Sequence, residues 1–236
     1  MRLLLERSEH RASRAALGPV PAGVLVAWTA VVGTLIAISY AANALSPRVA
    51  NRDVLYEYET AFGSLVVYAV MAVLVLMIAR PLSREAMGFR RPVSWLRAVW
   101  LTLGSLGLIW GLGALLDGYL AAGEEQGLLP DGWDSSRAGA YAANFAVIAV
   151  VAPLVEETTY RGLGFAAVGA VTGPAVAILV TGLSFGLAHG LVLALPVLAA
   201  LGVALAWLRW QTMSIYPPIA AHALFNAAAL VAAVTV

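Results

Sequence analysis

The run AGAYAANFAVIAVVAPLVEETTYRGLGFAAV occupies residues 138–168, and its only charged residues are Glu156, Glu157 and Arg161. About 20 consecutive apolar residues are enough to cross a bilayer as a helix, so this run is long enough to span a membrane. Ionisable side chains at membrane depth are costly, and a function is the default explanation for them. We therefore expect a membrane helix that carries part of a functional site.

The rest of the chain has the same character, with 61% of its 236 residues hydrophobic and 11% charged. Soluble domains carry about 25% charged residues, so the composition excludes an ordinary soluble domain. Only helices and closed barrels satisfy the backbone in lipid, and long continuous apolar runs favour helices. We predict an all-α polytopic transmembrane helix bundle, one integral membrane domain over residues 1–236, with about seven spanning helices. The apolar segments are 20–45, 61–79, 98–121, 138–168, 174–190, 192–209 and 217–235.

The arginines are unevenly distributed among the segments that connect these runs. They gather before the first run and between the second and third, at Arg2, Arg7, Arg11, Arg14, Arg80, Arg84, Arg90, Arg91 and Arg97. The connections 48–59 and 124–137 are rich in acidic residues instead. Because positive loops stay in the cytoplasm, we expect a multi-pass protein of the cell membrane with a cytoplasmic N-terminus and an external C-terminus. In this orientation the charged residues of 138–168 lie toward the cytoplasmic end of their helix.

The first apolar span is about 22 residues long, which exceeds the h-region of a cleaved signal peptide. We expect an uncleaved first helix, although Ala42-Asn43-Ala44 offers small residues at cleavage-site spacing.

The chain has no cysteine, which excludes disulfides, thiol nucleophiles and metal sites with cysteine ligands.

Glycines recur at four-residue spacing in two of the apolar segments. They form the patterns Gly107-xxx-Gly111 and Gly182-xxx-Gly186-xxx-Gly190. Such spacing lets membrane helices approach closely, so we expect both patterns to serve helix packing. No internal repeat is visible, which disfavours a transporter.

Two further motifs place polar residues one helical turn from a partner, Phe185-Gly-Leu-Ala-His189 and His222-Ala-Leu-Phe-Asn226. Glu157 and Arg161 have the same spacing and can pair on one helix face. Glu156 is rotated by about 100° from Glu157, so we expect it to lack an adjacent cation and to act as a proton acceptor.

Pro153 should loosen the helix just before Glu156 and open room for water or substrate.

A carboxylate, two imidazoles and a carboxamide suffice to hydrolyse an amide, because the carboxylate activates water and the donors hold the oxyanion. Two histidines and one glutamate could also bind zinc, although the helical His-Glu-x-x-His signature is absent. Each group alone has a structural explanation: an ion pair, a histidine bonded to a carbonyl, a helix–helix hydrogen bond, or packing by Phe185. Together they favour one shared site.

Over roughly residues 138–230 the sequence resembles the CAAX protease and bacteriocin-processing family, also called the Abi family. Glu-Glu-xxx-Arg, Phe-xxx-His and His-xxx-Asn occur in the order typical of that family. The resemblance implies an intramembrane endopeptidase that acts without a metal or other cofactor, with zinc as the alternative. It implies that Glu156 activates water with His189, that Glu157 and Arg161 hold the site, and that His222 and Asn226 stabilise the oxyanion.

The resemblance also implies a peptide or membrane-protein substrate in the lipid bilayer, and no nucleic acid. Family members in eukaryotes cleave prenylated CAAX peptides, but nothing in this chain indicates prenyl recognition, and the oligomeric state stays open. Two rivals are a non-catalytic membrane scaffold or immunity protein with the same fold, and a proton-coupled carrier. The intact set of three motifs disfavours the first rival, and the lack of repeats disfavours the second.

A shared site requires the side-chain tips of Glu156, His189, His222 and Asn226 to lie within about 10 Å of one another. The predicted helix boundaries conflict with this distance requirement. If the fifth helix starts near Pro174, His189 lies about 22 Å along it, far from the expected depth of Glu156. We therefore expect the helix boundaries to differ from the apolar segments.

Overall fold

The computed structural model describes residues 20–45, 53–120, 125, 130 and 132–235. Every element over these residues is helical, and six helices are long and apolar enough to cross a membrane. The predicted all-α membrane bundle is thus confirmed. Several charged residues used above to predict orientation lie outside the described residues: Arg2, Arg7, Arg11, Arg14, Arg48, Glu124 and Asp131.

Over the described residues the helices form seven successive helical columns, and the fourth column consists of five consecutive pieces. The first three columns are α2 (Ala22–Leu45), α3 (Tyr58–Ala79) and α4 (Trp95–Leu120). The fourth joins α6 (Ala138–Ala146), η3 (Val147–Val151), α7 (Ala152–Glu157), η4 (Thr158–Gly164) and α8 (Phe165–Thr172), where η3 and η4 are π-helical. The last three are α9 (Pro174–Leu187), α10 (Leu195–Thr212) and α11 (Tyr216–Thr235), and short 3₁₀ turns lie at Val54–Tyr56 and Ser135–Arg137.

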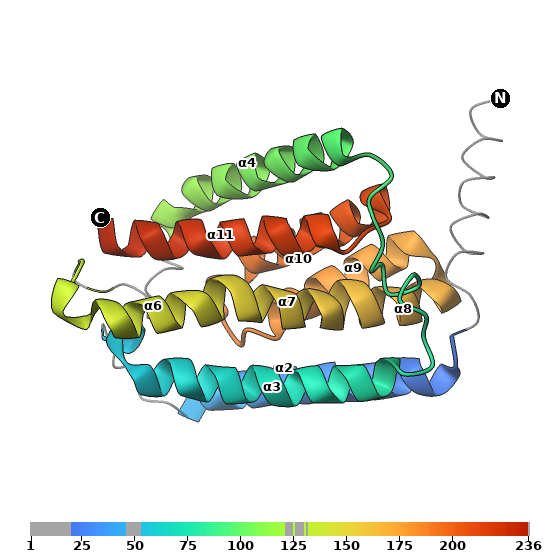
Figure 1. Ribbon diagram of the computed structural model, residues 1–236, viewed down its shortest axis with the longest axis horizontal. Coiled ribbons are helices and arrows are strands. Elements are labelled where there is room, and N and C mark those ends of the chain that lie inside the picture. Colours follow the sequence, from blue (N-terminus) through green and yellow to red (C-terminus); the bar gives the residue numbers. More distant parts are fainter. Residues whose placement is uncertain (1–19, 46–52, 121–124, 126–129, 131, 236) are drawn as a thin grey trace.

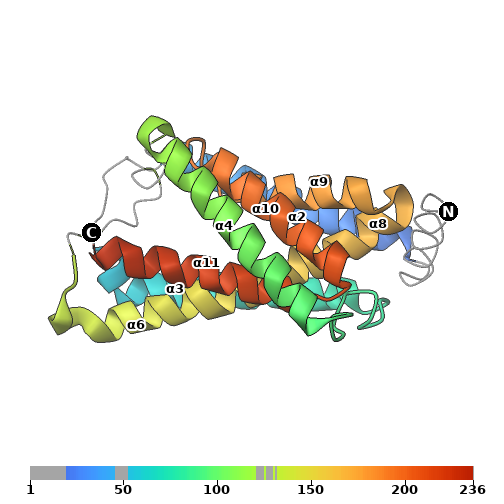
Figure 2. The same ribbon diagram turned by 90° about the horizontal axis from the view of Figure 1, so that it is seen from above.

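The column α6–α8 runs through the middle of the bundle. Figure 1 shows it between the pair α2 and α3 on one side and α10 and α11 on the other. Helix α4 lies outermost and crosses α10 and α11 obliquely (Figure 2). Residues 159–169 of the column are all buried, so its C-terminal half forms the core of the protein.

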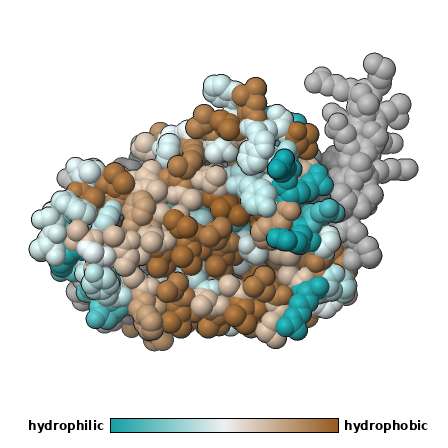
Figure 3. Space-filling view, viewed as in Figure 1, coloured by the Kyte–Doolittle hydropathy of each residue, from teal (hydrophilic) through white to brown (hydrophobic). Residues whose placement is uncertain are grey.

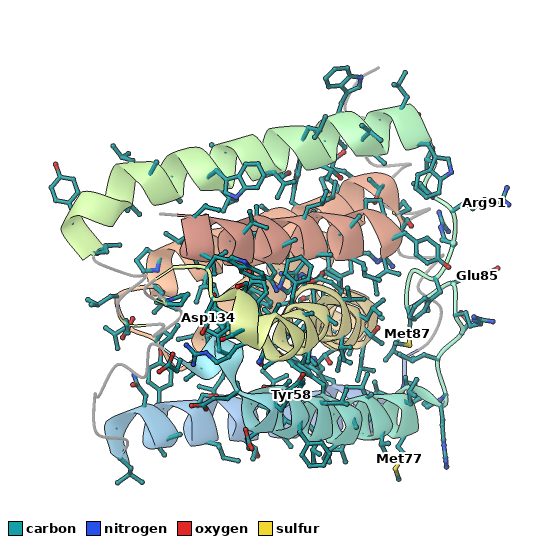
Figure 4. The ribbon with its side chains drawn as sticks, turned by 60° about the vertical axis from the view of Figure 1, so that its left-hand side comes forward. Tyr58, Met77, Glu85, Met87, Arg91 and Asp134 are labelled. Atoms are coloured by element: carbon teal, nitrogen blue, oxygen red, sulfur yellow. The ribbon has the colours of Figure 1, made fainter. Side chains whose placement is uncertain are left out.

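The outer surface is apolar over the middle of the molecule. Figure 3 shows a hydrophobic face that gives way to hydrophilic residues at the end where the segment between α3 and α4 lies. At that end Glu85 and Arg91 point away from the bundle, whereas Met87 is buried (Figure 4). Large apolar side chains such as Val67 and Trp100 are more than half exposed, as lipid-facing residues are. The protein is therefore a multi-pass membrane protein.

The fifth apolar segment differs from its prediction, because α9 has 14 residues and ends at Leu187 rather than at residue 190. Gly173, with a φ of 92°, turns the chain sharply between α8 and α9. Along this antiparallel hairpin, 16 residues after Gly173 lead to His189 and 16 residues before it lead to Glu157, so both lie at a similar depth. The predicted difference in depth between His189 and the glutamates is thus removed.

The predicted place of the glutamates along their helix was also wrong. The column extends to Thr172, four residues beyond the predicted segment. Glu156 lies 18 residues after Ala138 and 16 before Thr172, and is therefore close to the midpoint of the column rather than near one end.

Glycines bring α9 and α10 into backbone contact, as one of the two glycine patterns predicts. A Cβ atom on Gly182 or Gly186 would lie 2.6–2.8 Å from the backbone nitrogen of Val203 or Ala199. The pattern Gly107-xxx-Gly111 does not pack in this way. Among the described residues, no neighbouring helix comes within 4 Å of a Cβ placed on either glycine, so the packing role predicted for this pattern is wrong within one chain.

We predict that Gly202→Ala destabilises the protein by about 1–3 kcal/mol, the usual cost of overpacking a core. The added methyl group would overlap the carbonyl group of Gly182 in the facing helix. Gly107→Ala is the matched control on α4, and should be neutral or stabilising by up to about 1 kcal/mol because alanine favours a helix. Thermal unfolding in detergent measures both, and equal effects of the two substitutions would contradict the packing described here.

Candidate active site

The backbone of the central column departs from the α-helical pattern on both sides of the two glutamates. The Ala152 N–H bonds the Val147 carbonyl five residues back, which is the π-helical pattern. The next bond in this register would join residue 153 to Ile148, but Pro153 has no N–H. The Asn226 Nδ2 of α11 supplies the missing donor, at 2.8 Å from the Ile148 carbonyl oxygen. Pro153 therefore loosens the helix as predicted, and π turns are frequent at functional sites.

Helix α2 supports the second π turn. The Trp28 Nε1 donates a hydrogen bond of 3.0 Å to the carbonyl of Thr159, and the Trp28 ring fills the space where a Cβ on Gly164 would lie. At its C-terminal end the same helix holds the turn after His189, because the Asn43 Nδ2 donates to the Gly190 carbonyl at 2.9 Å.

Glu157, Arg161 and His222 form a buried, hydrogen-bonded cluster. The Arg161 guanidinium donates to Glu157 Oε1 at 3.0 Å, as the four-residue spacing predicts, and His222 Nδ1 lies 2.9 Å from the same oxygen. Side-chain exposure is 0% for Glu157 and Arg161 and 3% for His222. Arg161 also donates to the Gly202 carbonyl at 2.6 Å, which ties the cluster to α10.

The contact with Glu157 sets the tautomer of His222. A carboxylate accepts hydrogen bonds, so the proton of this contact belongs to His222 Nδ1. The other ring nitrogen, Nε2, then lies on the side of Glu156, at 3.8 Å from Glu156 Oε2. The two adjacent glutamates thus contact the two nitrogens of one imidazole, one closely and one across a gap.

Glu156 differs from Glu157 in its partners. Its side chain is 13% exposed, and the hydroxyl of Tyr68 on α3 donates to Oε1 at 2.7 Å. Among the described residues, no group donates a hydrogen bond to Oε2, although this oxygen is buried. The two oxygens of Glu156 therefore differ: a neutral donor fixes Oε1, and Oε2 has no donor among the described residues.

Phe185 brings the two histidines together. Its fully buried ring lies 4.9 Å from the ring of His189 and 5.2 Å from that of His222, and the Arg161 guanidinium lies 4.6 Å from its centre. The Phe185 carbonyl also accepts a hydrogen bond of 2.8 Å from His189 Nδ1. Nε2 of His189 has no partner among the residues that the structure describes, and His189 is exposed whereas His222 is buried.

The six residues singled out in the sequence are thus connected in different ways. Glu157 contacts both Arg161 and His222, and Glu156 faces His222. The Phe185 ring lies between His189 and His222 and packs against both. One amide hydrogen of Asn226 forms a helix–helix hydrogen bond to the Ile148 carbonyl, and the oxyanion role expected of this residue stays a prediction. Sequence reasoning missed Tyr68, which lies in an apolar run with no polar motif around it.

The donor set of the site does not fit a zinc ion. No group of three or more His, Asp or Glu side chains that could hold a metal ion occurs in the described part of the chain. Glu157 Oε1 is already shared by the Arg161 guanidinium and the His222 ring, and a bound cation would have to compete with that guanidinium.

We predict that Glu157→Gln lowers the free energy of unfolding by about 3–5 kcal/mol, the cost of removing one partner of a buried ion pair. The amide would leave the guanidinium of Arg161 buried without a counter-charge. Glu85→Gln is the matched control, because Glu85 is exposed, and it should leave the unfolding temperature in detergent unchanged. A Glu157→Gln protein as stable as wild type would contradict the structural role of this pair.

The comparison with known families finds a match over the segment that contains the site. Residues 138–228 match the family described as type II CAAX prenyl endopeptidase Rce1-like, a span that begins at α6, ends within α11 and includes all six residues discussed above. No curated protein and no solved structure matches the chain. Residues 138–228 therefore form a domain of the Rce1-like type II CAAX prenyl endopeptidase family, the CAAX protease and bacteriocin-processing or Abi family, whose members are peptidases.

Proposed function

We propose that the protein is an intramembrane endopeptidase in which Glu156 activates the water that hydrolyses a peptide bond. The observation that carries this proposal is the state of the Glu156 carboxylate. Oε1 is held by Tyr68, while the buried Oε2 has no hydrogen-bond donor among the described residues and lies 3.8 Å from His222 Nε2. A water bound there would have an acceptor for its proton within hydrogen-bond reach.

In the proposed reaction, Glu156 takes a proton from water as the water oxygen attacks the carbonyl carbon of the substrate. The same carboxyl group then gives that proton to the amide nitrogen as the carbon–nitrogen bond breaks. His189 acts with Glu156 through its free Nε2, because Nδ1 is held by the Phe185 carbonyl. His189 is exposed, so it is the member of the pair that an incoming peptide meets first.

The negative charge that develops on the carbonyl oxygen needs donors that are already in place. We assign this role to His222 and Asn226. His222 turns Nε2 toward the reacting groups, while Nδ1 is anchored on Glu157. Asn226 keeps one amide hydrogen after its bond to Ile148, and that hydrogen is the one available to the oxyanion.

Glu157 and Arg161 hold this arrangement and do not react. The guanidinium of Arg161 neutralises Glu157, so of the two adjacent carboxylates Glu156 is the one left to take up a proton. The proposed substrate is a peptide or a segment of a membrane protein that reaches the site within the bilayer.

We predict that Glu156→Gln lowers the rate of peptide cleavage by about 10²–10⁴-fold, the usual contribution of a general base. The amide has the same shape but cannot accept the proton of the water. Cleavage of a broad library of model peptides in detergent or liposomes is measured for wild type, Glu156→Gln and the control Glu85→Gln, together with thermal unfolding.

The outcomes of this experiment separate three explanations. A fully active Glu156→Gln enzyme would refute Glu156 as the base. An inactive protein with a lowered unfolding temperature would assign a structural role to Glu156 instead. A wild-type protein that cleaves no peptide in the library would favour a non-catalytic scaffold over the peptidase.

We further predict that cleavage does not require zinc. The purified protein should contain no stoichiometric zinc, and chelators should leave the rate of cleavage unchanged, because the carboxylate of Glu157 is neutralised by Arg161. Elemental analysis that finds one zinc per chain, lost together with activity on chelation, would contradict this mechanism.

A further inference from the structure

A hydrogen bond between two side chains joins Glu156 of the central column to a helix outside the family match. The Tyr68 hydroxyl donates a hydrogen bond of 2.7 Å to Glu156 Oε1, and Tyr68 belongs to α3, whereas the match covers only residues 138–228. After Tyr68, α3 contains only apolar residues up to Ala79. We propose that Tyr68 is a positioning residue that fixes which oxygen of Glu156 meets the water, an inference that rests on the proposed function of Glu156.

The need for such a residue follows from the geometry of a glutamate side chain. The terminal torsion of Glu is broad and roughly two-fold, so an unrestrained carboxylate turns freely and presents either oxygen. Tyr68 holds Oε1 on the side of α3 and thereby leaves Oε2 on the side of His222 Nε2. The bond selects one of two otherwise equivalent oxygens.

The surroundings of Tyr68 support this role rather than simple packing. Its neighbours Val66, Val67 and Val70 on α3 are about half exposed, on a face of the helix that lipid covers. The phenol is turned away from that face, is half-buried, and finds an acceptor, as a tyrosine hydroxyl away from water usually must. Because the phenol is neutral, it directs the carboxylate without forming an ion pair with it.

A positioning role predicts a specific kinetic effect. Tyr68→Phe removes one oxygen atom, keeps the ring, and frees the carboxylate to rotate. Misplacement of a reacting group by about 1 Å costs on the order of 10²-fold in rate. We expect kcat to fall by about 10- to 100-fold, with KM unchanged because Tyr68 lies behind Glu156 rather than in contact with the substrate.

The matched control is Tyr58→Phe, the same chemical change on the same helix. Tyr58 lies ten residues before Tyr68, about 15 Å along α3, and its side chain is exposed. A second measurement combines Tyr68→Phe with Glu156→Gln. If Tyr68 acts through Glu156, the double variant should be no slower than Glu156→Gln alone. All rates are measured on the folded fraction isolated by size-exclusion chromatography.

Each outcome bears on one of the two proposals. A Tyr68→Phe enzyme with wild-type kcat, or with a raised KM and unchanged kcat, would overturn the positioning role while an inactive Glu156→Gln leaves the proposed function in place. Additive losses in the double variant would also overturn it. A fall in unfolding temperature with unchanged kcat per folded molecule would mean that Tyr68 serves stability only. A wild-type protein that cleaves nothing would overturn the proposed function and this inference together.

Discussion

The arrangement of the protein depends on one buried atom, Glu157 Oε1, which both Arg161 and His222 contact. Removing charged groups from water costs several kcal/mol per ion, so neither the carboxylate nor the guanidinium can be buried without the other. The same guanidinium bonds the Gly202 carbonyl of α10 and lies against Phe185 of α9. The positions of α9, α10 and α11 around the central column are therefore coupled to a single ion pair.

The irregular backbone of the column is the second constraint. π turns flank the six-residue helix α7 that carries both glutamates, and wide turns leave carbonyls without their usual partners. Unpaired carbonyls are costly in lipid, and here side chains from neighbouring helices donate hydrogen bonds to them. Asn226 bonds Ile148 and Trp28 bonds Thr159, from α11 and α2 respectively. The turns next to the glutamates can therefore persist only in the assembled bundle.

The sequence predicts those features that depend on local spacing and composition. Apolar runs indicate the helices, and the four-residue spacing of Glu157 and Arg161 predicts their pairing, because both are properties of one helix. The end of α9, the depth of Glu156 and the open surroundings of Gly107 depend on how helices meet, which a single segment does not encode. Tyr68 was missed for the same reason, since nothing in its own helix marks it out from a lipid-facing aromatic residue.

Residues 138–228 supply the charged groups of the site and α2 and α3 supply neutral ones, as the low dielectric of the bundle requires. Among the described residues, Glu156, Glu157, Arg161 and His222 all lie within residues 138–228. Helices α2 and α3 contribute neutral hydrogen-bond donors: Trp28, Asn43 and Tyr68. A cation in place of Tyr68 would hold Glu156 equally well in position. However, it would favour the ionised form and make the carboxylate a poorer proton acceptor. A neutral phenol fixes the geometry of the proposed base without neutralising it, which explains why two adjacent glutamates can take different roles.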